Sequence, residues 1–102
     1  MPRWIPVAQV DECLPGQSLE RVAEGRIVAL FNVDGTFYAL DGVCPHQGGP
    51  LGKGLIQGCL VSCPWHGWQF DVRDGQSQIN PQMKQPRFDI RIEAGTVLVD
   101  LG

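Results

Sequence analysis

The chain has 102 residues, 43% hydrophobic and 19% charged, which is a globular composition of about one domain's length. A net charge of −3 argues against a nucleic-acid partner, because phosphate contacts need a basic face. No apolar run approaches the roughly 20 residues that span a bilayer, and the N-terminal residues lack the apolar segment of a signal peptide. We therefore expect one cytoplasmic domain over residues 1–102 with no membrane partner.

Short strands separated by turns fill the first 40 residues. Trp4–Ala8 and Leu19–Val22 are β-rich, and Gln9–Leu14 between them predicts one helical turn. Arg26–Val33 and Thr36–Leu40 flank an Asp-Gly pair, which is the usual signal for a two-residue hairpin turn.

The second half of the chain continues this pattern. Strands are predicted over Cys59–Ser62, Gly67–Val72, Phe88–Ile92 and Thr96–Asp100. No stretch of about 12 residues has the 3.6-residue apolar period of an amphipathic helix. The sequence therefore predicts an all-β fold, an antiparallel sandwich or barrel.

One region, residues 43–68, concentrates the residues that can bind metal. It contains three of the four cysteines and both histidines, arranged as Cys44-x-His46 and Cys63-x-x-His66. Thiolates and neutral imidazoles suit iron or zinc. A proline after each of these cysteines stiffens its loop, and nearby glycines allow the backbone to approach a bound group closely.

Zinc is the competing interpretation of this ligand set. Structural zinc sites favour paired cysteines followed by paired histidines, whereas here cysteine and histidine alternate and the first pair is separated by one residue. The alternation suits a site with two metals, in which one atom takes both cysteines and the other takes both histidines.

The run CPHQGGPL…CPWHGWQFDVRDG resembles the two ligand loops of the Rieske iron–sulfur family. The resemblance implies a Rieske-type antiparallel β-sandwich, with a small cluster-binding subdomain at about residues 43–72 that carries two ligand loops. It implies one 2Fe–2S cluster, with Cys44 and Cys63 on one iron and His46 and His66 on the other, and no catalytic residue. A third, proline-containing loop would cover the cluster, and residues 80–86 lie in the matching place.

The departures from the high-potential branch of this family concern four positions. Gly49 and Trp65 stand where that branch has an inter-loop disulfide, and Trp68 and Phe70 stand where it has a serine and a tyrosine hydroxyl. Fewer hydrogen bonds to sulfur stabilise the reduced cluster less. We therefore expect a reduction potential toward the low end of the Rieske range, about −150 mV.

The resemblance implies a soluble, monomeric one-electron carrier. It would pass electrons from an NAD(P)H-dependent flavoprotein reductase to a terminal oxygenase that hydroxylates aromatic rings. The chain has two histidines, both assigned to the cluster, so none remains for a mononuclear catalytic iron, and we do not expect an enzyme. The alternative is a small subunit of a larger redox enzyme, such as an NAD(P)H-nitrite reductase.

Several other residues have more ordinary interpretations. Cys13 and Cys59 have no partner at ligand spacing and are expected to pack as small apolar side chains. Trp65 and Trp68 are expected to pack around the second loop, and Lys53 to be a solvated loop charge.

Overall fold

The computed structural model describes residues 2–44, 48–65 and 67–102, and the regular structure in these ranges is almost entirely strand. In chain order the elements are β1 (Trp4–Gln9), η1 (Val10–Glu12), β2 (Ser18–Ala23), β3 (Arg26–Val33), β4 (Thr36–Asp41), η2 (Leu51–Lys53), β5 (Leu55–Gln57), β6 (Leu60–Ser62), β7 (Gln69–Asp71), β8 (Arg87–Phe88), β9 (Ile90–Glu93) and β10 (Thr96–Asp100). The strands pair in antiparallel fashion, so the all-β prediction is confirmed. No helix in the described ranges is long and apolar enough to cross a membrane.

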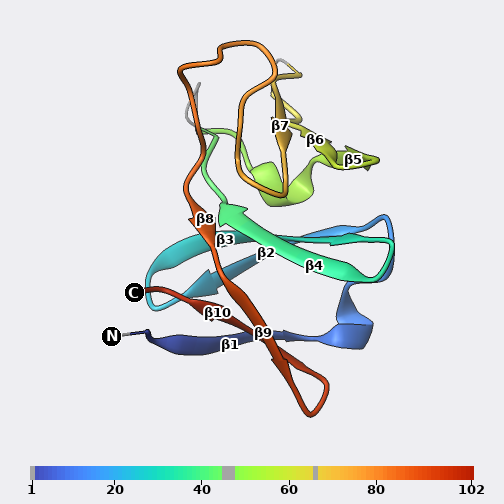
Figure 1. Ribbon diagram of the computed structural model, residues 1–102, viewed down its shortest axis with the longest axis vertical. Coiled ribbons are helices and arrows are strands. Elements are labelled where there is room, and N and C mark those ends of the chain that lie inside the picture. The colour runs from blue at the N-terminus through green and yellow to red at the C-terminus, as the bar shows by residue number, and fades with distance from the viewer. Residues whose placement is uncertain (1, 45–47, 66) are drawn as a thin grey trace.

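Two sheets, which we call the base, form the lower half of the molecule in Figure 1. One has the strand order β1-β10-β9 and the other β2-β3-β4-β8. Their facing sides enclose an apolar core whose fully buried members include Val28, Leu30, Ala39, Val97 and Val99. Such a core is what the predicted sandwich requires.

Strand β3 is apolar along most of its length because both of its faces are covered. Val28 and Leu30 point into the core of the base, whereas Ala29 and Phe31 belong to a second apolar core on the opposite side of the sheet. Successive side chains of a strand point to opposite faces, so one continuous apolar run supplies both cores.

The predicted β3–β4 hairpin is confirmed. Val33 pairs with Thr36, and the two residues between them, Asp34 and Gly35, have φ angles of 52° and 93°. Positive φ at both central residues is the requirement of the type I′ turn, which glycine meets without strain and aspartate tolerates.

The predicted strand Phe88–Ile92 is divided in the structure. Residue 89 ends the pairing of β8 with β4, and the chain continues as β9, which pairs with β10 in the other sheet. The sequence pattern did not reveal the division, because the apolar alternation runs through residue 89 without a break. This crossing links the two sheets of the base.

A third sheet, β5-β6-β7, lies above the base in Figure 1. Strands β6 and β7 fall within the predicted segments but are shorter, and β5 was not predicted. The three residues of β5 stand between glycines and are too few to show an alternating pattern.

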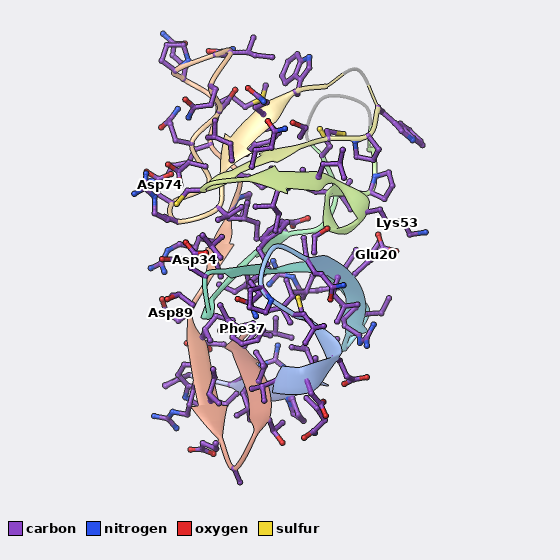
Figure 2. All side chains as sticks on the ribbon, turned by 90° about the vertical axis from the view of Figure 1, so that its right-hand side faces the viewer. Glu20, Asp34, Phe37, Lys53, Asp74 and Asp89 are labelled. Atoms are coloured by element: carbon purple, nitrogen blue, oxygen red, sulfur yellow. The ribbon has the colours of Figure 1, made fainter. Side chains whose placement is uncertain are left out.

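The short helix η2 joins this upper sheet to β2 of the base. The Ser18 hydroxyl donates a hydrogen bond to the carbonyl of Gly54 at 2.6 Å. A Cβ atom on Gly52 would stand 2.9 Å from Cα of Glu20, so only glycine lets η2 lie this close to β2. Figure 2 shows Glu20 and Lys53 on the same flank at this junction, and Lys53 is exposed, as its prediction as a solvated charge requires.

Candidate metal centre

The two cysteine loops, residues 44–49 and 63–68, are closed by the same pair of backbone hydrogen bonds. In the first loop the Cys44 N–H donates to the carbonyl of Gly49 at 2.9 Å, and the Gly48 N–H donates to the carbonyl of Cys44 at 2.8 Å. In the second, the Cys63 N–H donates to the carbonyl of Trp68 at 2.7 Å, and the Gly67 N–H donates back to Cys63 at 3.2 Å.

A glycine at the fourth position after each cysteine makes this closure possible. Gly48 and Gly67 have φ angles of 75° and 69°, in the left-handed region that other residues rarely adopt. The two loops therefore present their cysteines in the same way, although their histidines stand at different distances along the chain.

The fold brings Cys44 and Cys63 together. Their exposed fractions are 1% and 2%, and both lie in the second apolar core, between the upper sheet and the base. Burial raises the pKa of the Cys63 thiol, a backbone hydrogen bond from Trp65 opposes that rise, and the adjacent Cys44 thiol adds to it. Two thiols in contact, both almost without solvent exposure, are suited to share a soft metal, which binds them as thiolates.

Gly49 of the first loop lies against the second cysteine. A Cβ atom on Gly49 would stand 2.8 Å from Sγ of Cys63, closer than such atoms approach in proteins. The absence of a side chain at this position is what allows the two loops to close around the same point.

His46 and His66 lie outside the described residues, so the structure gives no account of the imidazole half of the predicted set. The tryptophans flanking His66 are described. Trp65 is 49% exposed and reaches across to Gly49, whereas Trp68 is half-buried and packs against the core that contains the two cysteines. The packing role expected for Trp68 is confirmed, whereas Trp65 contacts Gly49 but leaves about half of its surface exposed.

The other two cysteines lie apart from this pair. Cys13 is fully buried in the core of the base, where burial raises its pKa and its Sγ lies 3.4 Å from the carbonyl of Gln17. Cys59 is half-buried in the turn between β5 and β6, and its carbonyl accepts the Val72 N–H at 2.8 Å. All four cysteines are free thiols in the structure, and the packing role predicted for Cys13 is confirmed.

The predicted covering loop, residues 80–86, is tied to the chain that precedes it. The Gln76 amide donates to the carbonyls of Pro81 at 3.0 Å and Met83 at 3.2 Å. The Ser77 hydroxyl accepts the N–H groups of residues 79 and 80. The Met83 side chain packs against the core that holds Cys44 and Cys63, so this loop shares an apolar core with the cysteine pair.

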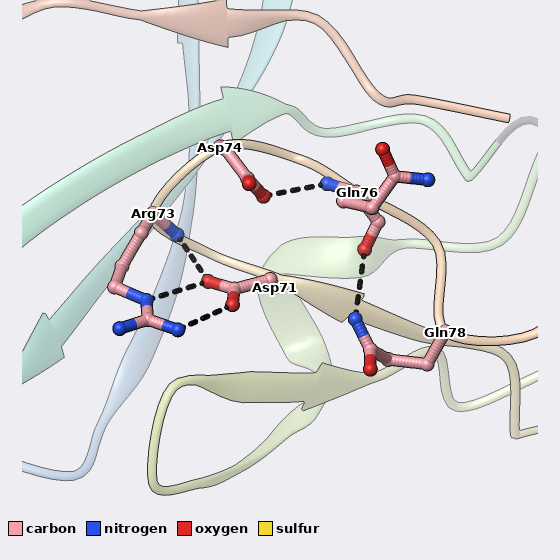
Figure 3. Close-up of polar contacts among 5 residues, drawn as sticks. All are labelled: Asp71, Arg73, Asp74, Gln76 and Gln78. Atoms are coloured by element: carbon pink, nitrogen blue, oxygen red, sulfur yellow. Dashed lines mark hydrogen bonds and ion pairs between the residues drawn. The ribbon is translucent and has the colours of Figure 1, made fainter. Parts of the chain in front are cut away.

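The turn after β7 leads from the second loop to the covering loop, and ion pairing fixes it (Figure 3). The Asp71 carboxylate accepts the backbone N–H of Arg73 at 2.9 Å and pairs with the guanidinium at 3.0 and 2.8 Å. This guanidinium holds the pKa of the Asp71 carboxyl below its ordinary value. The Gln76 N–H donates to the Asp74 carboxylate at 2.9 Å, which closes the turn.

Sequence reasoning missed two side chains that hold the site together, Gln76 and Gln85. Both amides donate to backbone carbonyls of neighbouring loops. Glutamine carries no strong positional signal in a loop, because its partners here are backbone carbonyls, which any residue can supply. The burial of Gln85, at 2% exposure, is evident only in three dimensions.

The residues present fit an iron–sulfur cluster with mixed ligands. Two buried thiols supply the cysteine half of the set, and the lack of a third cysteine beside them argues against an all-cysteine site. Each of the two loops that carry Cys44 and Cys63 also contains one histidine in the sequence.

Comparisons with known proteins point to the same kind of cluster. The model of the Rieske [2Fe-2S] domain matches residues 3–97. The biphenyl dioxygenase ferredoxin subunit of Pseudomonas sp. (strain KKS102) is 39% identical over 93 residues, which cover 89% of this chain and 85% of that protein.

Two solved structures are similar over nearly the whole chain. The first, described as the complex of reduced oxygenase and oxidized ferredoxin in carbazole 1,9a-dioxygenase, has a TM-score of 0.87 at 26% identity and covers 95% of this chain and 92% of that one. The second, a putative NADH-dependent nitrite reductase small subunit from Mycobacterium tuberculosis, has a TM-score of 0.92 over 100% and 97% of the chains. At 24% identity the second likeness concerns the fold alone. With the family match spanning residues 3–97, this chain belongs to the Rieske [2Fe-2S] domain family, whose members hold one 2Fe–2S cluster.

Proposed function

We propose that this protein is a Rieske-type ferredoxin, a one-electron carrier. It takes electrons from an NAD(P)H-dependent flavoprotein reductase and delivers them to a terminal oxygenase, one that hydroxylates aromatic rings. The observation that carries the proposal is the contact between two buried cysteines on two identically closed loops. Relatives that are named as ferredoxin components of dioxygenase systems support the proposal.

The proposed ligands are Cys44 and Cys63 on one iron and His46 and His66 on the other. The cluster supplies reversible one-electron chemistry when bound. The chain adds apolar surroundings on the cysteine side, because both thiols lie in an apolar core. The exposed Trp65 keeps an apolar surface next to one proposed ligand, which suits brief contact with another protein.

The proposed domain is one unit over residues 1–102, with the cluster-binding part at about 43–72. The protein works as a cytoplasmic monomer.

The ligand assignment is tested by optical and electron paramagnetic resonance (EPR) spectra of the purified protein. We expect the visible absorption of a mixed-ligand 2Fe–2S centre and, on reduction, a signal of low average g. The variant His66→Cys should change both, and Cys59→Ser, its control outside the proposed ligand set, should change neither. An unchanged spectrum in His66→Cys, or a colourless zinc protein, would refute the assignment.

The carrier role is tested by turnover with a reductase and an oxygenase. A carrier in substoichiometric amount should support many oxygenase turnovers, because it exchanges between partners, and should sediment as a free monomer. A chain that remains bound to one large redox enzyme at equal stoichiometry would instead be a fixed subunit.

A further inference from the structure

The side chain of Gln85 is buried at the point where the covering loop meets the base. Its exposed fraction is 2%, although its neighbours Lys84 and Pro86 are exposed. The Nε2 amide donates to two carbonyls, that of Asp41 at 2.6 Å and that of Val43 at 2.7 Å. Both hydrogens of this amide are therefore used within the protein.

These two carbonyls belong to the segment that leads into the first cysteine loop. Asp41 is the last residue of β4, and Val43 directly precedes Cys44. The backbone of Gly42, between them, bonds in the other direction, donating to Ile27 at 2.8 Å and accepting the Leu51 N–H at 3.0 Å. The segment is thus held by β3 and η2 on one side, and by the Gln85 amide and the Pro86 carbonyl of the covering loop on the other.

The backbone of Gln85 is tied to the segment that leaves the second cysteine loop. Its N–H donates to the carbonyl of Gly75 at 2.8 Å, in the turn that follows β7. A Cβ atom on Gly75 would stand 2.0 Å from the carbonyl oxygen of Gln85, so the two backbones touch. One residue of the covering loop therefore connects the entry to the first loop with the exit from the second.

An apolar side chain could fill the space of Gln85 but could not replace these bonds. It would leave the carbonyls of Asp41 and Val43 without the donors they now have, at hydrogen bonds that are partly buried. The entry to the Cys44 loop would keep its other backbone bonds, to Ile27, Leu51 and Pro86, but would lose the bond at Val43, directly before Cys44. Cys44 could then shift relative to Cys63.

We infer that Gln85 is a positioning residue of the electron-transfer site, whose amide fixes the Cys44 loop relative to the Cys63 loop and so sets both cluster retention and reduction potential. The inference rests on the proposed function, since it takes Cys44 and Cys63 as the cluster's cysteine ligands. Gln85 acts through the backbone before Cys44 and does not touch the ligand sulfurs in this role.

The test compares Gln85→Met with Gln82→Met in the cluster-loaded protein. Methionine matches glutamine in length but donates no hydrogen bond, and Gln82 is an exposed glutamine of the same covering loop. For each variant we would measure the rate of bleaching by an iron chelator, the midpoint potential and the EPR g values of the reduced form.

In Gln85→Met we expect bleaching at least about fivefold faster than in the parent protein, equivalent to about 1 kcal/mol, together with a shifted potential and altered g values. Gln82→Met should match the parent in all three. If Gln85→Met fails to fold, Gln85→Asn, which keeps the amide on a shorter side chain, is measured in its place.

Gln85→Met with unchanged potential and g values would overturn the inference, even at a lower melting temperature, because it would leave Gln85 a purely structural role. In that case the proposed function would stand, since the parent still shows its cluster spectrum. A parent protein without that spectrum would overturn both.

Discussion

The side chain of Trp65 lies across Gly49 of the opposite loop, with its Cγ and Cβ atoms 3.1 and 3.2 Å from where a Cβ atom of residue 49 would stand. In the high-potential branch of the Rieske family, the residues at these two positions are joined by a disulfide. Cβ atoms joined by a disulfide are about 3.8 Å apart. The two loops therefore approach about as closely here as bridged loops do, with an aromatic side chain on a bare backbone in place of the covalent bond.

The first prediction concerns that contact. Gly49→Ala places a methyl group within 2.8 Å of Sγ of Cys63 and forces the loops apart. We expect less cluster per chain after purification and a stability loss of about 1–3 kcal/mol, the usual cost of overpacking. Iron and sulfide analysis and urea unfolding measure the two effects. Gly58→Asn is the control, because Gly58 has open space around it and a φ of 63° that asparagine tolerates. A fully loaded Gly49→Ala protein would show that the close approach is dispensable.

The second prediction concerns Phe70, which is fully buried in β7 and shares a core with Cys44 and Cys63. Phe70→Tyr adds a hydroxyl where the high-potential branch has one. A new hydrogen bond to sulfur, with a net value of about 0.5–1.5 kcal/mol, should raise the potential by about 20–65 mV in a one-electron couple. Redox titration measures the shift, and Phe70→Leu, which has no hydroxyl, should not produce it. A potential that falls, or that rises equally in both variants, would contradict the hydrogen-bond explanation.

The third prediction separates the cost of backbone strain from the cost of steric overlap when a glycine is replaced. Gly75 and Gly95 have nearly equal φ angles, 84° and 80°, but only Gly75 has a neighbour within reach, the Gln85 carbonyl. Gly95→Ala should cost about 1–2 kcal/mol from backbone strain alone. Gly75→Ala should cost about 1–3 kcal/mol more, because its methyl group also overlaps backbone. Equal losses in urea unfolding would mean that the turn shifts without resistance.

The fourth prediction is a pH dependence. The pKa of Asp71 is lowered in the folded protein by the Arg73 guanidinium, so the carboxylate stabilises the fold at pH values above its unfolded pKa, about 3.9. That stabilisation disappears as the pH falls through the lowered value. Asp71→Asn should therefore reduce stability at pH 7 and have a progressively smaller effect below about pH 4. Urea midpoints at a series of pH values test this, with Asp34→Asn in the exposed hairpin turn as the comparison; a pH-independent effect would exclude the ion pair as its source.

Much of the fold could be predicted because local patterns determined it. The Asp34-Gly35 turn and its flanking strands were found, since a type I′ turn depends on two residues and needs no distant contact. The break at residue 89 was not found, because it depends on which sheet each half of the segment joins. Strand pairing between distant segments leaves little trace in a single sequence.

The same distinction between local patterns and distant contacts applies to the residues of the site. Cys44 and Cys63 were identified by spacing and by resemblance, and the structure places them in contact. Gln85 was not identified, because its partners at Asp41 and Val43 lie more than 40 positions away and offer only backbone carbonyls. A backbone acceptor has no sequence identity, so no residue pattern marks it.

The matched closure of the two cysteine loops has a consequence for protein engineering. Each loop is closed by hydrogen bonds between its own ends, from Cys44 to Gly48 and Gly49 and from Cys63 to Gly67 and Trp68. The closure of each loop therefore rests on residues at its own ends, within a segment of six. We expect such a segment to keep this closure when it is grafted onto another antiparallel strand pair or exchanged with its counterpart here. The position of its cysteine relative to the other loop depends in addition on contacts outside the segment, such as the Gln85 amide.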